Sequence, residues 1–223
     1  MSISIPAFNE RETLSGVVQE SIEAAERMCG DFEILVIDDG STDGTSAIAD
    51  GLARQDSRIR VIHHRQNQGF GETLKEVYVL PRKEWIFFVP GDGQIAPKEL
   101  VKLAPAAVDH DLILGRRIHR RDSWMRSAQA GVYNALVSLV LGRRIRDVDS
   151  VFLLRRRALG DIEIKGRSVF IHAEVCFKIA RQGGKIVEIE IEHRPRHRGV
   201  ASGSSACVVA KTIWDFFKYC VNG

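Results

Sequence analysis

Apolar-rich runs alternate with segments of helical periodicity along the first half of the chain, and this alternation limits the fold more than any other feature. Runs of four or five residues lie at 2–5, 33–37, 60–63 and 85–89. Short apolar runs between helices are typical of parallel strands that are buried on both faces. We therefore expect an α/β fold with a mostly parallel central sheet, flanked by helices and connected by right-handed crossovers.

Helix signals separate these strands and continue beyond them. Asn9 followed by Glu12 is a capping-box pattern, which predicts that the first helix begins after Asn9, and Gly30 is expected to end it. The remaining helices are expected at 44–54, 72–80, 97–108, 124–141 and 171–182, and further strands at 111–115, 151–154 and 185–192. The run at 185–192 alternates apolar and acidic residues, which predicts a strand with one face in water.

Neither an internal repeat nor a low-complexity linker divides the chain, so we expect one domain over residues 1–203. Residues 204–223 are expected to add a C-terminal amphipathic helix. Its apolar and cationic residues are Val208, Val209, Lys211, Ile213, Phe216, Phe217 and Lys218. Such a helix either lies on a membrane surface or covers the sheet as a core helix.

The length, hydrophobic content and cysteine spacing are those expected of a globular protein in a reducing compartment. A length of 223 residues with 44% hydrophobic residues suits one domain with a sizeable core. Four cysteines lack CxxC spacing, which favours scattered thiols over a zinc site. We expect neither an N-terminal secretory signal nor an apolar stretch of the ~18 residues that a membrane span requires.

Positive charge is concentrated in the middle of the chain. Residues 115–157 contain eleven arginines and three aspartates, an excess of eight positive charges in a chain whose net charge is +3. The rest of the chain is therefore net negative by five. This separation indicates that the middle segment faces an anionic partner, although a solvated basic surface would give the same pattern.

Polar residues follow the predicted strands. In open α/β sheets ligands bind outside the carboxyl ends of the strands. The segments that follow these ends are 6–10 (PAFNE), 38–41 (DDGS), 67–71 (NQGFG), 92–94 (DGQ) and 116–117 (RR). Ser41 or Asp43 could simply cap the next helix, but two adjacent acids, Asp38 and Asp39, are more than a cap needs.

Two common nucleotide-binding motifs are absent from these positions. A dinucleotide-binding Rossmann fold requires G-x-G-x-x-G after the first strand, where this chain has no glycine. The chain also lacks a P-loop sequence. The glycine pair Gly69 and Gly71 is too short to indicate either fold.

An ordered set of short motifs runs along the chain: 5–10 (IPAFNE), 36–45 (VIDDGSTDGT), 67–71 (NQGFG), 91–94 (GDGQ), 115–117 (GRR), 133–136 (YNAL), 141–142 (LG), 147–152 (DVDSVF) and 196–199 (RHRG). Together these motifs resemble the GT-A glycosyltransferases of family 2, in particular the dolichyl-phosphate mannose synthase and polyprenyl-phosphate glycosyltransferase branch. The resemblance covers about nine tenths of the chain, and it implies the GT-A fold.

The resemblance also implies site residues for a nucleotide-sugar donor. The base, ribose and pocket positions would be Pro6, Phe8, Glu10, Asp38, Asp39, Asn67 and Gly71, with Asp38 reaching the base. Asp92 and Gln94 would bind Mg²⁺ or Mn²⁺ on the diphosphate. The family usually has an acid two residues before Asp92, where this chain has Pro90, so the metal site has one carboxylate fewer.

For the acceptor, the resemblance implies a polyprenyl or dolichyl phosphate held by Arg117 and Arg126, with Arg196 closing over the diphosphates. A lipid monophosphate is already an anion near neutral pH, because its second pKa is about 6, so it needs cations rather than a general base. Two departures affect this region. The branch has a lysine where this chain reads Ala201-Ser202, so Arg198 would have to substitute, and Val151 replaces a glycine.

Two alternatives remain. Asp147 and Asp149 could act as a general base for a saccharide hydroxyl in envelope polysaccharide synthesis, or could simply pair with Arg144 or Arg146. A nucleic-acid-binding protein would use the arginines but leave the strand-end acids unexplained, so no nucleic-acid partner is expected. The resemblance implies a cytoplasmic enzyme, peripheral on the cytoplasmic face of a membrane. The oligomeric state is not predicted.

Overall fold

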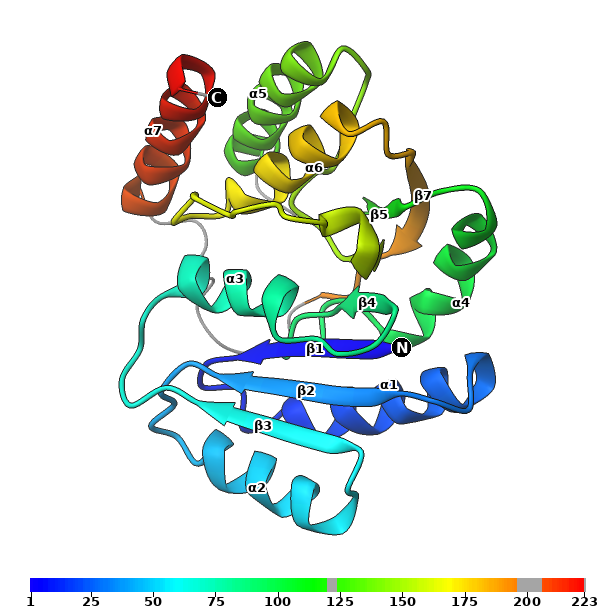
Figure 1. Cartoon of the computed structure of the whole chain (residues 1–223). Helices are drawn as coiled ribbons and strands as arrows, with labels where there is room; N and C mark the ends of the chain where they lie inside the picture. The colour runs from blue at the N-terminus through cyan, green and yellow to red at the C-terminus, as the bar shows by residue number, and fades with distance from the viewer. Residues whose placement is uncertain (120–123, 196–205, 223) are drawn as a thin grey trace.

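The computed structural model describes residues 1–119, 124–195 and 206–222. Its strands are β1 (Ser2–Ala7), β2 (Glu33–Asp38), β3 (Ile59–His63), β4 (Trp85–Phe88), β5 (Leu112–Ile118), β6 (Phe152–Arg155) and β7 (Ile186–Glu192). They form one sheet in the order β3-β2-β1-β4-β6-β5-β7 (Figure 1). Only β6 is antiparallel to its neighbours, β4 and β5. The expected α/β architecture with a mostly parallel sheet is therefore confirmed.

Helices cover both faces of this sheet. They are α1 (Leu14–Met28), α2 (Thr45–Gln55), α3 (Phe70–Val79), α4 (Leu100–Leu103), α5 (Trp124–Leu141), α6 (Ile171–Arg181) and α7 (Ala206–Asn222). One core lies between the sheet and α1, α2 and α4, and the other between the sheet and α3, α5, α6 and α7. The apolar run of β2 is continuous because its side chains alternate between two cores. Ile34 and Val36 enter the first core, while Leu35 and Ile37 enter the second.

Two helix predictions were wrong. The first helix begins at Leu14 with Thr13 as its N-cap, not after Asn9. Asn9 adopts a left-handed backbone conformation with φ of 56°, and its side chain accepts a hydrogen bond from the Thr42 amide, so it connects two loops instead of capping a helix. The segment 97–108 is not one helix but a short α4 between two 3-10 turns, Pro97–Glu99 and Ala104–Val108, and Pro105 lies at the start of the second turn.

The C-terminal helix α7 packs against α6 through its inner face. Phe216 is 6% exposed, and its ring meets that of Phe170 edge to face at 6.0 Å. Tyr219 packs on Phe177 with 5.2 Å between ring centroids. The inner face therefore covers the second core, as one of the two expected alternatives proposed. The predicted boundary between residues 203 and 204 lies outside the described residues and stays a prediction.

The carboxyl ends of the parallel strands meet at one edge of the sheet. The strand register places Ala7 beside Asp38, and Asp38 beside His63. Because β6 reverses direction between β4 and β5, the end of β5 returns to the same edge as the ends of β1 to β4. This topology positions the residues that follow β1, β2, β3 and β4 together with those at the end of β5.

Candidate functional site

The loops after β1 and β2 are joined by reciprocal hydrogen bonds. The Asn9 amide donates to Ser41 Oγ at 2.9 Å, and the Glu10 amide donates to Thr45 Oγ1 at 2.9 Å. Pro6 is buried in β1, whereas the Phe8 side chain is 40% exposed at the edge. These bonds hold the first loop in place while leaving an aromatic ring on the surface of the site.

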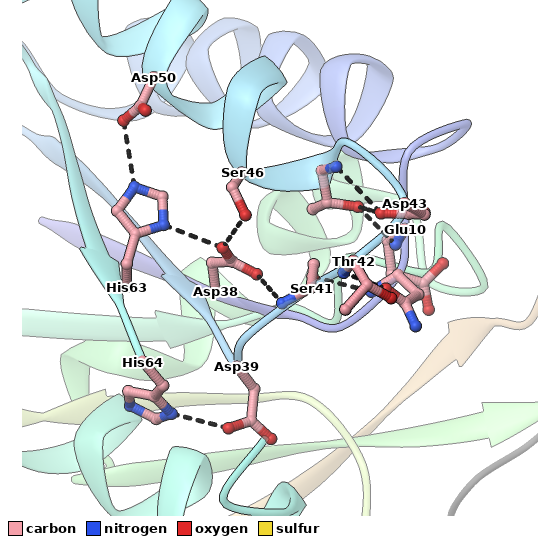
Figure 2. A network of polar contacts seen from close by, with 12 residues as sticks. Glu10, Asp38, Asp39, Ser41, Thr42, Asp43, Ser46, Asp50, His63 and His64 are labelled. Carbon is pink, nitrogen blue, oxygen red and sulfur yellow. Dashed lines mark hydrogen bonds and ion pairs between the residues drawn. The ribbon is translucent and has the colours of Figure 1, made fainter. Parts of the chain in front are cut away.

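Asp38, at the end of β2, is almost completely buried and already accepts three hydrogen bonds (Figure 2). Its donors are the Ser41 amide at 3.1 Å, Ser46 Oγ at 2.5 Å and His63 Nδ1 at 2.9 Å. Burial acts to raise the pKa of Asp38, but these hydrogen bonds outweigh burial and leave the pKa below its usual value. The Ser41 side chain adds a further hydrogen bond that also lowers the pKa of Asp38.

Asp39, the next residue, organises the loop that leads into α3. Its Oδ1 accepts from the Gln68 amide at 2.8 Å, and its Oδ2 accepts from the Gly69 amide at 3.0 Å. Asn67 lies in this loop and is exposed. Asp39 therefore fixes the backbone immediately after the exposed Asn67.

Two glycines in these loops are required by close backbone packing. Gly40 has φ of 71°, and a Cβ atom there would lie 2.5 Å from the carbonyl carbon of Gln66. At Gly71 a Cβ would lie 2.2 Å from the carbonyl oxygen of Arg167. Gly71, expected in the nucleotide pocket, is thus in contact with the loop before α6.

The turn after β4 presents Asp92 at the same edge. Asp92 Oδ1 accepts from the Gln94 amide at 3.0 Å, and no hydrogen bond to its second oxygen is found within the described residues. The Gly91 carbonyl accepts from Thr13 Oγ1 at 2.8 Å, and the Gly91 amide donates to the Pro6 carbonyl at 3.0 Å. The turn is therefore held against the first loop and the start of α1.

The turn after β4 offers oxygen atoms that suit a divalent cation bound mainly by the phosphates of another molecule. These oxygen atoms belong to the Asp92 carboxylate and the Gln94 amide, which lies 3.4 Å from His193 Nε2. Among residues 1–119, 124–195 and 206–222 no group of three or more His, Cys, Asp and Glu side chains forms a complete metal site. Mg²⁺ commonly uses one or two carboxylates and completes its shell with phosphates and water, so these two residues fit such an ion.

Arg117, near the end of β5, forms a bidentate ion pair with Asp147. Nε and one terminal nitrogen of Arg117 lie 2.8 and 2.7 Å from the two Asp147 oxygens, and the guanidinium also donates to the Asp149 carbonyl at 3.0 Å. The alternative in which Asp147 simply pairs with Arg144 or Arg146 is therefore wrong. Sequence spacing favoured those neighbours, whereas the return of β5 to this edge brings Arg117 to Asp147.

Buried hydroxyl groups lie near this ion pair. Tyr133 Oη and Ser150 Oγ are buried and have no hydrogen-bond partner within the described part of the chain. Burial, and then the nearby Asp149 charge, raise the pKa of Tyr133 far above its usual value, so its hydroxyl keeps its proton. The Tyr133 hydroxyl is therefore a buried, neutral group near the Asp149 carboxylate.

Other expected site residues lie outside the described part. These are the side chain of Arg126 and all of Arg196, Arg198, Ala201 and Ser202. The sequence analysis also missed the two histidines, His63 and His64, that contact Asp38 and Asp39. Their signal was present, since two consecutive titratable residues end a predicted strand beside another strand that ends in acids.

The comparison with solved structures defines the class of the fold as GT-A. A solved structure of glucosyl-3-phosphoglycerate synthase from Mycobacterium tuberculosis, in complex with Mn²⁺, UDP and phosphoglyceric acid, matches with a TM-score of 0.74 and 19% identity. The match covers 98% of this chain and 78% of that one, which confirms the expected fold. The model of the family described as glycosyl transferase family 2 matches residues 2–162, and the chain belongs to this family.

Its curated relatives include enzymes named for polyprenyl phosphates. Undecaprenyl-phosphate 4-deoxy-4-formamido-L-arabinose transferase of Proteus mirabilis is 26% identical over 203 residues, covering 89% of this chain and 61% of the relative. Polyprenol monophosphomannose synthase of Mycolicibacterium smegmatis is 29% identical over 223 residues, covering 92% and 81%. The expected resemblance to the polyprenyl-phosphate branch is thus confirmed, while the chain spans about three fifths of the length of the first relative.

Proposed function

We propose that the protein transfers a sugar, with inversion, from a nucleoside diphosphate sugar to a polyprenyl phosphate. The observation that carries this proposal is the common edge of the sheet, where Asp38, Asp92 and Arg117 follow or end three different strands. Acids and amides suit the donor, and the arginine-rich segment suits an anionic acceptor. The names of the relatives, which include a polyprenol monophosphomannose synthase, agree with this acceptor.

The donor pocket is proposed to lie along the first three loops. The exposed Phe8 ring offers a surface for the base, and the exposed Asn67 offers an amide. Pro6, Glu10, Asp39 and Gly71 complete the proposed pocket, and Asp38 is proposed to reach the base.

Asp92 and Gln94 are proposed to hold Mg²⁺ or Mn²⁺ on the diphosphate of the donor. Solved structures of the similar synthase contain Mn²⁺ or Mg²⁺ together with UDP. Such a cation would stabilise the negative charge of the departing diphosphate. Asp92 contributes the carboxylate, and the Thr13–Gly91 hydrogen bond keeps the turn in position.

The acceptor phosphate is proposed to lie near Arg117. An oxygen of the phosphate attacks the anomeric carbon, the bond from that carbon to the diphosphate oxygen breaks, and the diphosphate leaves with the bonding electrons. No proton has to be removed from an acceptor that is already anionic. The alternative, a saccharide hydroxyl with Asp147 as general base, is less favoured because both Asp147 oxygens are engaged by Arg117.

Exposed apolar side chains on α5 and α7 support a peripheral location on a membrane, which we also propose. Within the described residues no helix is long and apolar enough to cross a bilayer. The exposed side of α7 carries Ile213, Trp214, Phe217 and Val221 with Lys211 and Lys218, and that of α5 carries Val132, Leu136, Leu139 and Val140. Apolar residues with cationic neighbours suit an anionic lipid surface, and the cytoplasmic face would present both substrates.

Transfer of radiolabel from a panel of GDP- and UDP-sugars to undecaprenyl phosphate tests the activity. The proposal predicts one donor that labels the lipid in the presence of Mg²⁺ or Mn²⁺. Labelling of an oligosaccharide but never of lipid phosphate would favour the hydroxyl acceptor. Steeply salt-dependent RNA binding without any nucleotide-sugar binding would favour a nucleic-acid-binding protein.

Sedimentation with vesicles tests the peripheral location separately. We expect binding to vesicles that contain phosphatidylglycerol and loss of that binding in the Trp214→Glu/Phe217→Glu variant. Val108, which is 80% exposed on a different element, provides the matched control Val108→Glu. Equal sedimentation of all three proteins would contradict the location without bearing on the chemistry.

A further inference from the structure

Two consecutive histidines at the end of β3 connect the buried acids of the site to helices on opposite faces of the sheet. Figure 2 shows His63 between Asp38 and Asp50, and His64 beside Asp39. Successive side chains of a strand point to opposite faces, so His63 turns toward α2 and His64 toward α3. Neither histidine belongs to the donor, metal or acceptor groups described above. Each of them nevertheless lies between two carboxylates.

His64 is the more completely enclosed of the two, with a side chain that is only 4% exposed. Its Nδ1 lies 2.7 Å from Asp39 Oδ1, and its Nε2 lies 2.9 Å from Glu76 Oε2 on α3. A neutral imidazole donates through one nitrogen only, whereas the protonated ring donates through both. Because both partners are carboxylates, the protonated form of His64 fits this position.

His63 repeats the arrangement on the other face. Its Nδ1 lies 2.9 Å from Asp38 Oδ2, and its Nε2 lies 3.1 Å from Asp50 Oδ1 on α2. This side chain is 37% exposed, so water weakens its interactions more than those of His64. The stronger argument therefore concerns His64.

The contact between His64 and Asp39 affects the loop that carries the exposed Asn67. Asp39 Oδ1 accepts hydrogen bonds from both His64 and the Gln68 amide, and Asp39 Oδ2 accepts one from the Gly69 amide. His64 thereby holds the carboxylate that fixes the loop between β3 and α3. If the loop were released, the fraction of molecules with a formed pocket would fall, and the apparent donor affinity would fall in proportion.

We propose that His63 and His64, in their protonated forms, are positioning residues that hold Asp38 and Asp39 and so keep the donor pocket formed, which makes donor binding weaken as the pH rises. This inference rests on the proposed function, because it assumes that the edge binds a nucleoside diphosphate sugar. Neither histidine touches the donor in this account. Each acts through the carboxylate beside it.

The charges around each ring agree with this assignment. His64 faces Asp39 from the end of β2 and Glu76 from α3, and His63 faces Asp38 and Asp50 from α2, while the exposed Arg65 is the neighbouring cation in the loop. Burial acts to lower the pKa of both histidines, but the hydrogen bonds to the carboxylates outweigh it and raise the pKa of each. The protonated forms thus persist above the ordinary pKa of histidine.

Calorimetric titration of the protein with UDP-glucose and GDP-mannose, at constant Mg²⁺ and from about pH 6 to about pH 8.5, tests the proposal. These sugar nucleotides have no phosphate group that titrates in this interval, so the protein supplies any dependence. We expect the Kd of the bound donor to rise about tenfold over the interval. In His64→Gln, which can donate to only one carboxylate, the Kd should be about tenfold higher at the acidic end and should depend clearly less on pH than in the wild type, with the remaining dependence due to His63.

A second variant acts on the titration without touching Asp39. Glu76→Gln removes one of the two charges that favour protonated His64, so the pH at which binding weakens should move downward. His110→Gln is the matched control, because His110 contacts the Ala106 carbonyl near the opposite edge of the sheet. It should retain the wild-type profile.

Several results would overturn the proposal. A His64→Gln protein with a lower melting temperature but the wild-type Kd and pH profile would show a purely structural role. An unchanged profile in Glu76→Gln would also contradict it. If the wild-type protein bound neither sugar nucleotide at any pH while remaining folded, the proposed function itself would fail, and this inference would fall with it.

Discussion

The Arg117 guanidinium and the Asp147 carboxylate form a bidentate ion pair that ties the end of β5 to the loop before β6. Both side chains are largely buried, at 16% and 5% exposed. The pair therefore bears on two properties, the stability of the fold and the proposed binding of the acceptor phosphate. Removing only the cation leaves a buried charge without its main partner, which is costly.

The first prediction separates these two properties. Arg117→Ala should lower the free energy of unfolding by about 3–5 kcal/mol and slow transfer to lipid phosphate, but should leave nucleotide affinity unchanged. The double variant Arg117→Ala/Asp147→Asn should recover much of the stability without recovering turnover. Chemical denaturation and the lipid-labelling assay measure the two effects.

Arg116→Ala is the matched control, since Arg116 is the adjacent residue on β5 and pairs with Glu190 at the surface. It should change both quantities little, because exposed ion pairs contribute about 0–1 kcal/mol. Normal turnover with lipid phosphate in Arg117→Ala would remove the assignment of Arg117 to the acceptor.

The second prediction concerns a buried polar pair in the second core. The Tyr78 hydroxyl lies 2.7 Å from His172 Nδ1, and burial lowers the pKa of His172 to about 3, so the ring is neutral at physiological pH. Tyr78→Phe should cost about 1–3 kcal/mol because it leaves the imidazole nitrogen without its partner. Urea denaturation measures the loss, and an unchanged midpoint would show that the hydrogen bond contributes nothing.

The third prediction compares two glycines. Gly71→Ala should destabilise the protein by about 1–3 kcal/mol or more, because its Cβ would lie 2.2 Å from the Arg167 carbonyl oxygen. Gly16→Ala, at an exposed position inside α1 with nothing within 4 Å, should instead stabilise it by about 0.5–1 kcal/mol. Thermal melts of the two variants should shift in opposite directions, and a shared direction would contradict the packing at Gly71.

The fourth prediction concerns acid stability. The folded-state pKa of Asp38 is lowered, so its ionised form stabilises the fold above the unfolded pKa of about 3.9, and this contribution is lost as the pH falls through the folded pKa. Asp38→Asn should be less stable than wild type at neutral pH, and the difference should shrink in acid. The exposed Asp109→Asn provides the control. A constant difference between Asp38→Asn and wild type at all pH values would contradict the lowered pKa.

Sequence periodicity predicted the sheet because the burial of a strand determines its pattern of apolar residues. A strand such as β2 must be apolar on both faces when helices cover both, and its residues divide between the two cores. The motifs at strand ends were likewise predictable, since parallel strands bring their carboxyl ends to one edge. Helix starts were harder, because Asn9 and Thr13 are both plausible caps and only the contacts with the loop after β2 decide between them.

Pairings between distant residues could not be read from the chain. Asp147 has two nearby arginines in sequence, but its partner is thirty residues away on β5. The contacts of His63 and His64 depend on the register between β2 and β3 and on the helices above and below the sheet. Such pairings follow from topology, which local patterns constrain only indirectly.

The most direct test of the central claim is calorimetric titration of wild-type protein and Asp92→Ala with GDP- and UDP-sugars, each with and without Mn²⁺. The account predicts saturable binding of one donor that Mn²⁺ strengthens by at least about tenfold in the wild type, and loss of this strengthening in Asp92→Ala. Equal binding by both proteins under both conditions would contradict the metal assignment. Absence of binding to every donor by a folded wild-type protein would contradict the account as a whole.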